Sequence, residues 1–246
     1  MSKIFAANWK LNKSPSEARK FIQDFQKLAG SDSFYDGKDV LIFPSAFSLE
    51  AVSDEAKKTK IKFGPQNIYS EKAGAFTGEN SGEIAKQMGS EFILIGHSER
   101  RQIFQELDEN LNTKVKLVQA LNLIPVFCIG ETLAQREANE TESVCFSQLE
   151  AGLKDLDPSQ RLIVAYEPVW AIGTGKVATP EQVADVHLHL FKKLKAMGFI
   201  DYQLLYGGSV KPDNAAQLLK IAHVDGFLIG GAALDPVSFH KICQSV

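Results

Sequence analysis

The sequence predicts an α/β fold in which eight parallel β-strands close into a single (β/α)8 barrel. Three observations predict it: a length of 246 residues, eight short apolar runs, and helical periodicity between them. A closed barrel of this kind takes about 250 residues, or about 31 for each strand and helix. An open, doubly wound sheet is the alternative. Because no linker or low-complexity tract interrupts the pattern, we expect residues 1–246 to form one domain.

The eight apolar runs are the expected strands, since strands buried on both faces of a parallel sheet are almost continuously apolar. They span residues 4–7, 40–43, 61–63, 92–95, 124–129, 162–165, 203–205 and 226–229.

Helical periodicity is clearest in three of the intervening segments. Apolar residues recur at helical spacing over 18–28, and Gly30 supplies a stop. A second apolar stripe covers 104–118. A third helix is predicted to open at the capping box 179–182, with proline at its first position, and to end at Gly198.

The bulk properties exclude several function classes. A formal net charge of −3 provides no basic surface for nucleic acid or an anionic membrane. No apolar stretch approaches the roughly 18 residues of a membrane span. The three cysteines (Cys128, Cys145 and Cys243) form no Cys-X-X-Cys pair, so we expect a cytoplasmic protein without disulfides. Cys128 lies inside an apolar run and is expected to be buried filler rather than a reactive thiol.

Polar and glycine residues follow directly after the predicted strands. In a barrel the carboxyl ends of all strands share one rim, where the functional residues gather. The residues concerned are Asn8 and Lys10 after the first strand, Gln66 and Asn67 after the third, His97, Ser98 and Glu99 after the fourth, Gly130, Glu131 and Thr132 after the fifth, Glu167 after the sixth, Tyr206 and Ser209 after the seventh, and Gly230 and Gly231 after the eighth. Their convergence predicts an active site at this rim.

Glu167 is the candidate general base. It ends an apolar strand, and Pro168 restricts it to an extended conformation. The following segment reaches a Gly-X-Gly tip at Gly173 and Gly175, which could approach a phosphate as a lid. An ordinary surface turn with a solvated glutamate is the alternative.

Two Gly-Gly pairs, at 207–208 and 230–231, favour a phosphate site after the last two strands. Ser209 and Gly173 would add further donors. The segment 173–178 also matches a dinucleotide fingerprint, but that fingerprint should begin at the strand end, and Pro168, Val169 and Trp170 intervene here.

His97 and Lys10 complete the predicted chemistry, as a hydrogen-bond donor and a fixed cation near Glu99. Lys10 as a Schiff-base nucleophile is the alternative. The spacing of His187 and His189 does not suit a zinc site on one helix face, and no metal or cofactor motif is present. A base, a neutral donor, a cation and a phosphate cradle indicate proton abstraction next to the carbonyl of a small phosphorylated substrate.

Five motifs, in order and covering essentially the whole chain, resemble the triosephosphate isomerase family. They are Asn8-Trp9-Lys10, Gly96-His97-Ser98-Glu99-Arg100, the run from Ala165 to Gly175, Tyr206-Gly207-Gly208-Ser209-Val210 and Gly230-Gly231-Ala232. The sequence departs from the family pattern at Ser45 and Ala232, which puts only local rim packing in doubt.

The resemblance implies a TIM barrel that interconverts dihydroxyacetone phosphate and D-glyceraldehyde 3-phosphate without a cofactor, a step of glycolysis and gluconeogenesis. It implies Glu167 as the base, His97 as a neutral electrophile, Lys10 as the stabilising cation and Asn8 as a positioning residue. Neutral histidine in this enzyme is an established case of pKa tuning. The phosphate would be held by Gly173, Ser209, Gly230 and Gly231, and residues 168–178 would form a closing lid held by Tyr206 and Ser209.

The resemblance also implies a homodimer, in which loop 73–79 carries Thr77 toward the partner's site. From the residues alone, Phe76 in this glycine-flanked loop could equally pack onto its own barrel.

Two rival functions remain open here: a sugar-phosphate aldolase or epimerase, and a non-catalytic phosphate-binding barrel. A Schiff-base aldolase would need a lysine in a central strand, which 162–167 lacks. A binding protein would be expected to lose Lys10, His97 or Glu167, and all three are present.

Overall fold

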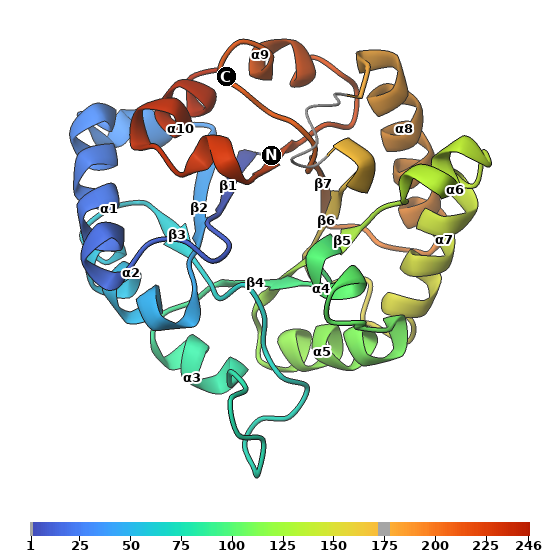
Figure 1. Cartoon of the computed structure of the whole chain (residues 1–246), viewed down its shortest axis with the longest axis horizontal. Coiled ribbons are helices and arrows are strands. Elements are labelled where there is room, and N and C mark those ends of the chain that lie inside the picture. The colour runs from blue at the N-terminus through green and yellow to red at the C-terminus, as the bar shows by residue number, and fades with distance from the viewer. Residues whose placement is uncertain (1, 172–177) are drawn as a thin grey trace.

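Eight parallel strands form the centre of the molecule, and helices surround them (Figure 1). The computed structural model describes residues 2–171 and 178–246. The strands are β1 (Lys3–Asn8), β2 (Lys38–Phe43), β3 (Lys62–Phe63), β4 (Phe92–Ile95), β5 (Ile124–Ile129), β6 (Leu162–Tyr166), β7 (Tyr202–Tyr206) and β8 (Gly226–Ile229). Their spatial order is β3-β2-β1-β8-β7-β6-β5-β4, so strands that are neighbours in sequence pair with one another, except β3 and β4, and β1 pairs with β8. The predicted (β/α)8 fold is confirmed.

Strands β3 and β4 are the two ends of this sheet, and backbone hydrogen bonds join them. The Glu91 N–H donates to the Phe63 carbonyl at 3.2 Å, and the Leu94 N–H donates to the Pro65 carbonyl at 3.1 Å. Gly64 permits the approach, since a Cβ atom there would lie 1.6 Å from the Phe92 carbonyl oxygen. The sheet therefore comes close to full closure, which leaves little exposed edge.

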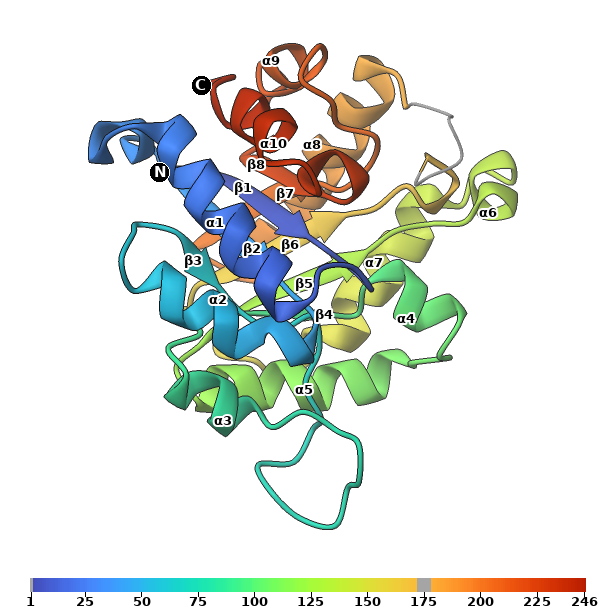
Figure 2. The same ribbon diagram turned by 60° about the vertical axis from the view of Figure 1, so that its left-hand side comes forward.

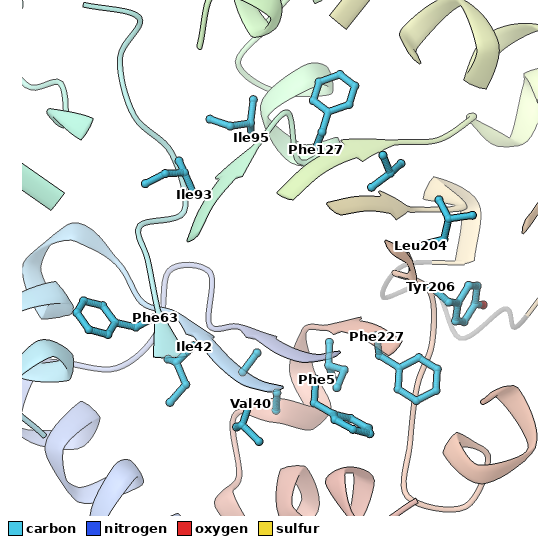
Figure 3. Packing of buried hydrophobic residues seen from close by; sticks show 14 of the residues in the cluster. Phe5, Val40, Ile42, Phe63, Ile93, Ile95, Phe127, Leu204, Tyr206 and Phe227 are labelled. Atoms are coloured by element: carbon cyan, nitrogen blue, oxygen red, sulfur yellow. The ribbon is translucent and has the colours of Figure 1, made fainter. Parts of the chain in front are cut away.

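The strands divide their side chains between two cores because successive residues point to opposite faces. The barrel interior is filled by Ile4, Ala6, Leu41, Phe43, Phe92, Leu94, Val126, Cys128, Ile163, Ala165, Leu205 and Leu228. The outward-facing residues, among them Phe5, Ile42, Ile95, Phe127 and Phe227, pack against the helices (Figure 3). Cys128 is fully buried in the inner core, as expected for filler.

Ten α-helices are found in the described part of the chain. They are α1 (Pro15–Ala29), α2 (Leu49–Ala56), α3 (Gly82–Gln87), α4 (Ser98–Gln102), α5 (Asp108–Ala120), α6 (Leu133–Glu137), α7 (Thr141–Gly152), α8 (Pro180–Ala196), α9 (Ala215–Leu218) and α10 (Pro236–Cys243). The predicted capping box of α8 is present, with the Thr179 side chain accepting from the Gln182 N–H. None of these helices is long and apolar enough to cross a membrane.

The second predicted helical stripe was partly wrong. Helix α5 buries Leu111, Val115 and Val118, but Phe104 and Leu107 precede it and are exposed. The backbone of Gln105 adopts a positive φ of 55°, which breaks helical continuity before α5 begins. Phe104 and Leu107 have helical spacing with the residues of α5, but the backbone at Gln105 keeps Phe104 out of that helix.

The chain between β3 and α3 forms a loop that projects away from the barrel in both views (Figures 1 and 2). All residues from 71 to 79 are exposed. Within the loop, the Phe76 ring packs on Tyr69 with their centroids 4.4 Å apart. Phe76 thus contacts its own loop and still keeps 38% of its surface exposed.

Candidate active site

A cavity of about 360 Å³ opens where the strands end. Its lining includes seven of the predicted site residues: Asn8, Lys10, His97, Glu167, Ser209, Gly230 and Gly231. These residues come from β1 and from the segments after β4, β6, β7 and β8, which meet only because the sheet curves into a barrel. Gly173, also predicted here, lies outside the described residues, as does most of the predicted lid 168–178.

Glu167 and His97 are in direct contact beside this cavity. The Glu167 Oε1 atom lies 2.9 Å from His97 Nε2, and Oε2 accepts the Ser98 backbone N–H at 2.8 Å. Glu167 is only 2% exposed, so the alternative of a solvated glutamate in an ordinary surface turn was wrong. A buried carboxylate needs such partners, because an unpaired one would be very costly.

The other ring nitrogen of His97 identifies its tautomer. The Glu99 backbone N–H, in the first turn of α4, donates to Nδ1 at 3.2 Å. Since Nδ1 accepts a hydrogen bond, it carries no proton, and Nε2 is the nitrogen that donates to Glu167. The ring therefore presents an N–H donor toward the cavity while it is neutral.

The charges of this pair shift both pKa values. Burial alone would raise the pKa of Glu167, but the charge and hydrogen bond of His97 and the Ser98 N–H hold it below its ordinary value. Burial alone would lower the pKa of His97, but the Glu167 carboxylate raises it above its ordinary value. Each group thus depends on the other, and His97 without that carboxylate would be shifted toward the neutral form.

Lys10 is held at both its backbone and its ammonium group. Its backbone has a positive φ of 51°, and its N–H donates to Asn8 Oδ1 at 3.0 Å. Its carbonyl accepts from Gln66 Nε2 at 2.9 Å. The ammonium Nζ lies 2.6 Å from Glu99 Oε1. The expected lysine–carboxylate pair is therefore present, and Asn8 fixes the turn that places the cation at the cavity.

Glycines let the backbone after β7 pass close to the base. A Cβ atom at Gly207 would lie 2.8 Å from Glu167 Cγ, and one at Gly208 would lie 2.2 Å from the Tyr206 hydroxyl. Gly231 faces open space, since a Cβ atom there would meet nothing within 4 Å. The predicted Gly-Gly pairs thus have different uses: the first allows close packing, and the second leaves the cavity wall bare.

The sequence indicated no role at this site for three further residues. Lys211 brings a second cation to the cavity lining. Cys128, from inside the barrel, lies against the Glu167 carboxylate, and burial together with that charge raises its pKa well above the ordinary value. Glu131, after β5, is a fully buried carboxylate that contacts Tyr166. Its position after a strand placed Glu131 at the rim in the sequence, but no residue pattern indicated a role for it.

The family model described as triosephosphate isomerase matches residues 3–246. The chain belongs to the triosephosphate isomerase family. It is 57% identical to the triosephosphate isomerase of Bdellovibrio bacteriovorus, over 99% of this chain and 100% of that relative. It is 44% identical to that of Mesomycoplasma hyopneumoniae and 43% identical to that of Solibacter usitatus, over 98% and 97% of both chains respectively.

Membership of the triosephosphate isomerase family confirms the predicted enzyme class, an isomerase that interconverts an aldose and a ketose. It also confirms the predicted substrate class, a triose phosphate. The aldolase, the epimerase and the non-catalytic barrel, which remained open on the sequence motifs, are thereby set aside.

Proposed function

We propose that this chain converts dihydroxyacetone phosphate to D-glyceraldehyde 3-phosphate and back through an enediolate, with Glu167 as the single base. The contact between Glu167 and His97 carries the proposal, because it places a carboxylate and an N–H donor on one side of the cavity. Glu167 takes a proton from C1, and the C–H electron pair forms the C1–C2 double bond. The C2 carbonyl oxygen becomes an oxyanion and takes the hydroxyl proton from O1. Glu167 then returns its proton to C2 as the C1–O1 bond becomes the aldehyde carbonyl.

His97 stabilises the developing oxyanion with its Nε2–H. A substrate carbonyl that takes this hydrogen bond replaces the Glu167 carboxylate, which is then free to reach the carbon-bound proton. Burial is the largest single influence on the pKa of His97, and without the opposing Glu167 carboxylate it favours the neutral ring. Lys10 adds a positive charge that Glu99 holds in place. One preorganised donor of this kind contributes about 10²–10³ in rate.

The phosphate group is bound by Ser209, Gly230 and Gly231, which line the part of the cavity after β7 and β8. The bare backbone at the two glycines lets amide groups approach the phosphate oxygens. Lys10 and Lys211 supply positive charge in the same cavity, which a chain of net charge −3 does not supply overall. Gly173 and the lid 168–178 belong to this proposal on their sequence motif alone.

We further propose that the active form is a homodimer joined through loop 73–79. Two observations support it: the loop projects from the barrel, and a groove of about 370 Å³ lies next to the active site. Leu11 and Phe47, which line that groove, are 96% and 93% exposed. Large apolar side chains so exposed mark an interface. The groove also reaches Asn8, Lys10 and His97, so a loop inserted there would touch the site.

The whole chain, 1–246, is proposed to act as one domain in the cytoplasm. The continuous eight-stranded sheet supports the first part, because its strands come from both ends of the chain. Three buried and unpaired cysteines support a reducing compartment.

The decisive experiment is isomerisation of D-glyceraldehyde 3-phosphate, coupled to a dehydrogenase specific for dihydroxyacetone phosphate, in the wild type and in Glu167→Gln. The variant should lose at least about 10² in kcat while inorganic phosphate still protects it from thermal unfolding. Turnover close to that of the wild type would remove Glu167 from the mechanism.

A further inference from the structure

Glu131 is a charged residue for which the proposed mechanism has no use. It follows β5, and its side chain is completely inaccessible to solvent. Its Oε1 atom accepts two hydrogen bonds, from the Tyr166 hydroxyl at 3.1 Å and from Trp170 Nε1 at 2.9 Å. Its Oε2 atom has no hydrogen-bond donor among the described residues. Such a carboxylate, away from water and only half satisfied, requires a nearby positive charge.

Arg136 supplies that charge. Its Nη1 atom lies 3.7 Å from Glu131 Oε1, and within the described chain no other cation comes within ion-pair distance of this carboxylate. The guanidinium also lies over the Trp170 ring, 5.7 Å from the centroid, and donates to Thr141 Oγ1 at 3.4 Å. Arg136 therefore contacts both Glu131 and a residue that Glu131 binds.

The residues that Glu131 binds stand on either side of the proposed base. Tyr166 precedes Glu167, and Trp170 follows it by three residues. The backbone of the same loop continues the contact: Glu167 N–H donates to Ile129 O at 2.7 Å, and Val169 N–H donates to Glu131 O at 3.1 Å. The loop after β5 thus holds the whole segment 166–170.

Close packing leaves this segment little room to move toward the loop. A Cβ atom at Gly130 would lie 1.8 Å from the carbonyl oxygen of Glu167. A change in the side-chain contacts of Glu131 therefore acts on backbone that is already in contact with the base. Misplacement of a catalytic group by about 1 Å can cost about 10² in rate.

We propose that Arg136 is a positioning residue for the isomerase reaction: its guanidinium pairs with the buried Glu131 carboxylate, and that carboxylate holds Tyr166 and Trp170, and hence Glu167, in place. A carboxylate holds these two donors more strongly than an uncharged acceptor would, because charge-assisted hydrogen bonds are about twice as strong. This inference rests on the proposed role of Glu167 as the base.

The test separates the effect of the Arg136 charge from the effect of its side-chain shape. In Arg136→Gln, kcat should fall by about tenfold or more while KM changes less than about twofold, because Ser209, Gly230 and Gly231 are untouched. Arg136→Lys keeps the charge and should retain kcat within about threefold of the wild type. The double variant Glu131→Gln/Arg136→Gln should match the single variant Glu131→Gln, because the effect proposed for the Arg136 charge passes through the Glu131 carboxylate.

The chain offers a matched control in Arg161. Its guanidinium lies 3.6 Å from Asp39 and 6.0 Å from the Phe92 ring centroid, and its side chain is 28% exposed against 24% for Arg136. Arg161 precedes β6, whereas Glu167 follows it. Arg161→Gln should therefore change stability without lowering kcat.

A readout without substrate separates this inference from the proposed function. Arg136→Gln should shift the fluorescence emission of Trp170, while the second tryptophan, Trp9, lies after β1 and contacts Phe21. If Glu167→Gln is fully active and Arg136→Gln still shifts the emission of Trp170, the proposed base is wrong. The contacts of Arg136 with Glu131 and Trp170 would nevertheless be supported.

Three results would overturn the inference: equal loss of kcat in Arg136→Lys and Arg136→Gln, an equal loss in Arg161→Gln, or additive losses in the double variant. If Arg136→Gln does not fold, the double variant decides, since it leaves no unpaired buried charge. Its kcat must then equal that of Glu131→Gln.

Discussion

Glu167 Oε1 lies 2.9 Å from His97 Nε2, so the two groups proposed to act on one substrate contact each other directly. The contact changes the protonation of both. It lowers the pKa of Glu167 and raises that of His97, against the effect of burial in each case. The pair therefore keeps the base ionised and occupies the Nε2 hydrogen bond that a substrate carbonyl would need.

Removing the Glu167 carboxylate should reverse the pKa shift of His97. In the wild type the ring should titrate above 6.5, and in Glu167→Gln it should titrate below 6.5, because burial then dominates. Nitrogen NMR of the imidazole rings would measure both values. If the pKa of His97 were shifted in the same direction in both proteins, the Glu167 carboxylate would not be the cause of the raised pKa.

The stability of the two proteins should follow the same signs. In the wild type the folded state binds the His97 proton more tightly than the unfolded state, so this contribution is lost as pH rises through the raised pKa. In Glu167→Gln the unfolded state binds it more tightly, so stability increases up to about pH 6.5. The free energy of unfolding of the wild type minus that of the variant should therefore shrink between about pH 6 and pH 8, as urea unfolding can measure.

Alanine at two glycines of the rim should affect different kinetic constants. In Gly207→Ala the new Cβ would lie 2.8 Å from Glu167 Cγ, so the carboxylate must move and kcat should fall by about 10². In Gly231→Ala nothing lies within 4 Å of the methyl group, so the fold is kept. The methyl group would hold the phosphate away and raise KM. Steady-state kinetics of both variants test this. If Gly207→Ala and Gly231→Ala changed kcat and KM in the same way, the two glycines would not have separate roles.

Loss of the Asn8 side chain should release the turn that places Lys10. Asn8→Ala removes the acceptor of the Lys10 N–H, and the positive φ of Lys10 then lacks its support. We expect a loss of about 1 kcal/mol in the free energy of unfolding and a fall in kcat/KM. Asn8→Asp keeps an acceptor at the same atom and should preserve the stability. Equal destabilisation by both substitutions would show that the hydrogen bond does not hold the turn.

The dimer proposal predicts that a substitution in loop 73–79 separates the two chains and lowers the activity. Sedimentation should give the wild type twice the chain mass of 27.1 kDa. Thr77→Arg should give a single chain with activity reduced by about tenfold or more, since a charge at an interface is costly to bury. Ser33→Arg introduces the same side chain on an exposed 3-10 turn before β2 and should remain a dimer. A wild-type protein that sediments as one chain at micromolar concentration would refute the proposal.

The sequence by itself determined the eight strands and the set of residues at the rim. It could do so because each strand is a local apolar run, and because parallel strands bring all their carboxyl ends to one side. That reasoning placed Asn8, Lys10, His97 and Glu167 together without any distance being known. Local backbone geometry was harder to predict from the sequence. Phe104 was expected in a helix, but it precedes α5 and is exposed.

Only the tertiary structure decided which side chains pair. Glu167 meets His97 across 70 positions of sequence, Glu99 meets Lys10 across 89, and Glu131 meets Trp170 across 39. Such contacts depend on strand register, on the closure between β3 and β4, and on the rotamers that packing allows. Those are properties of the assembled barrel and leave no periodic signal along the chain.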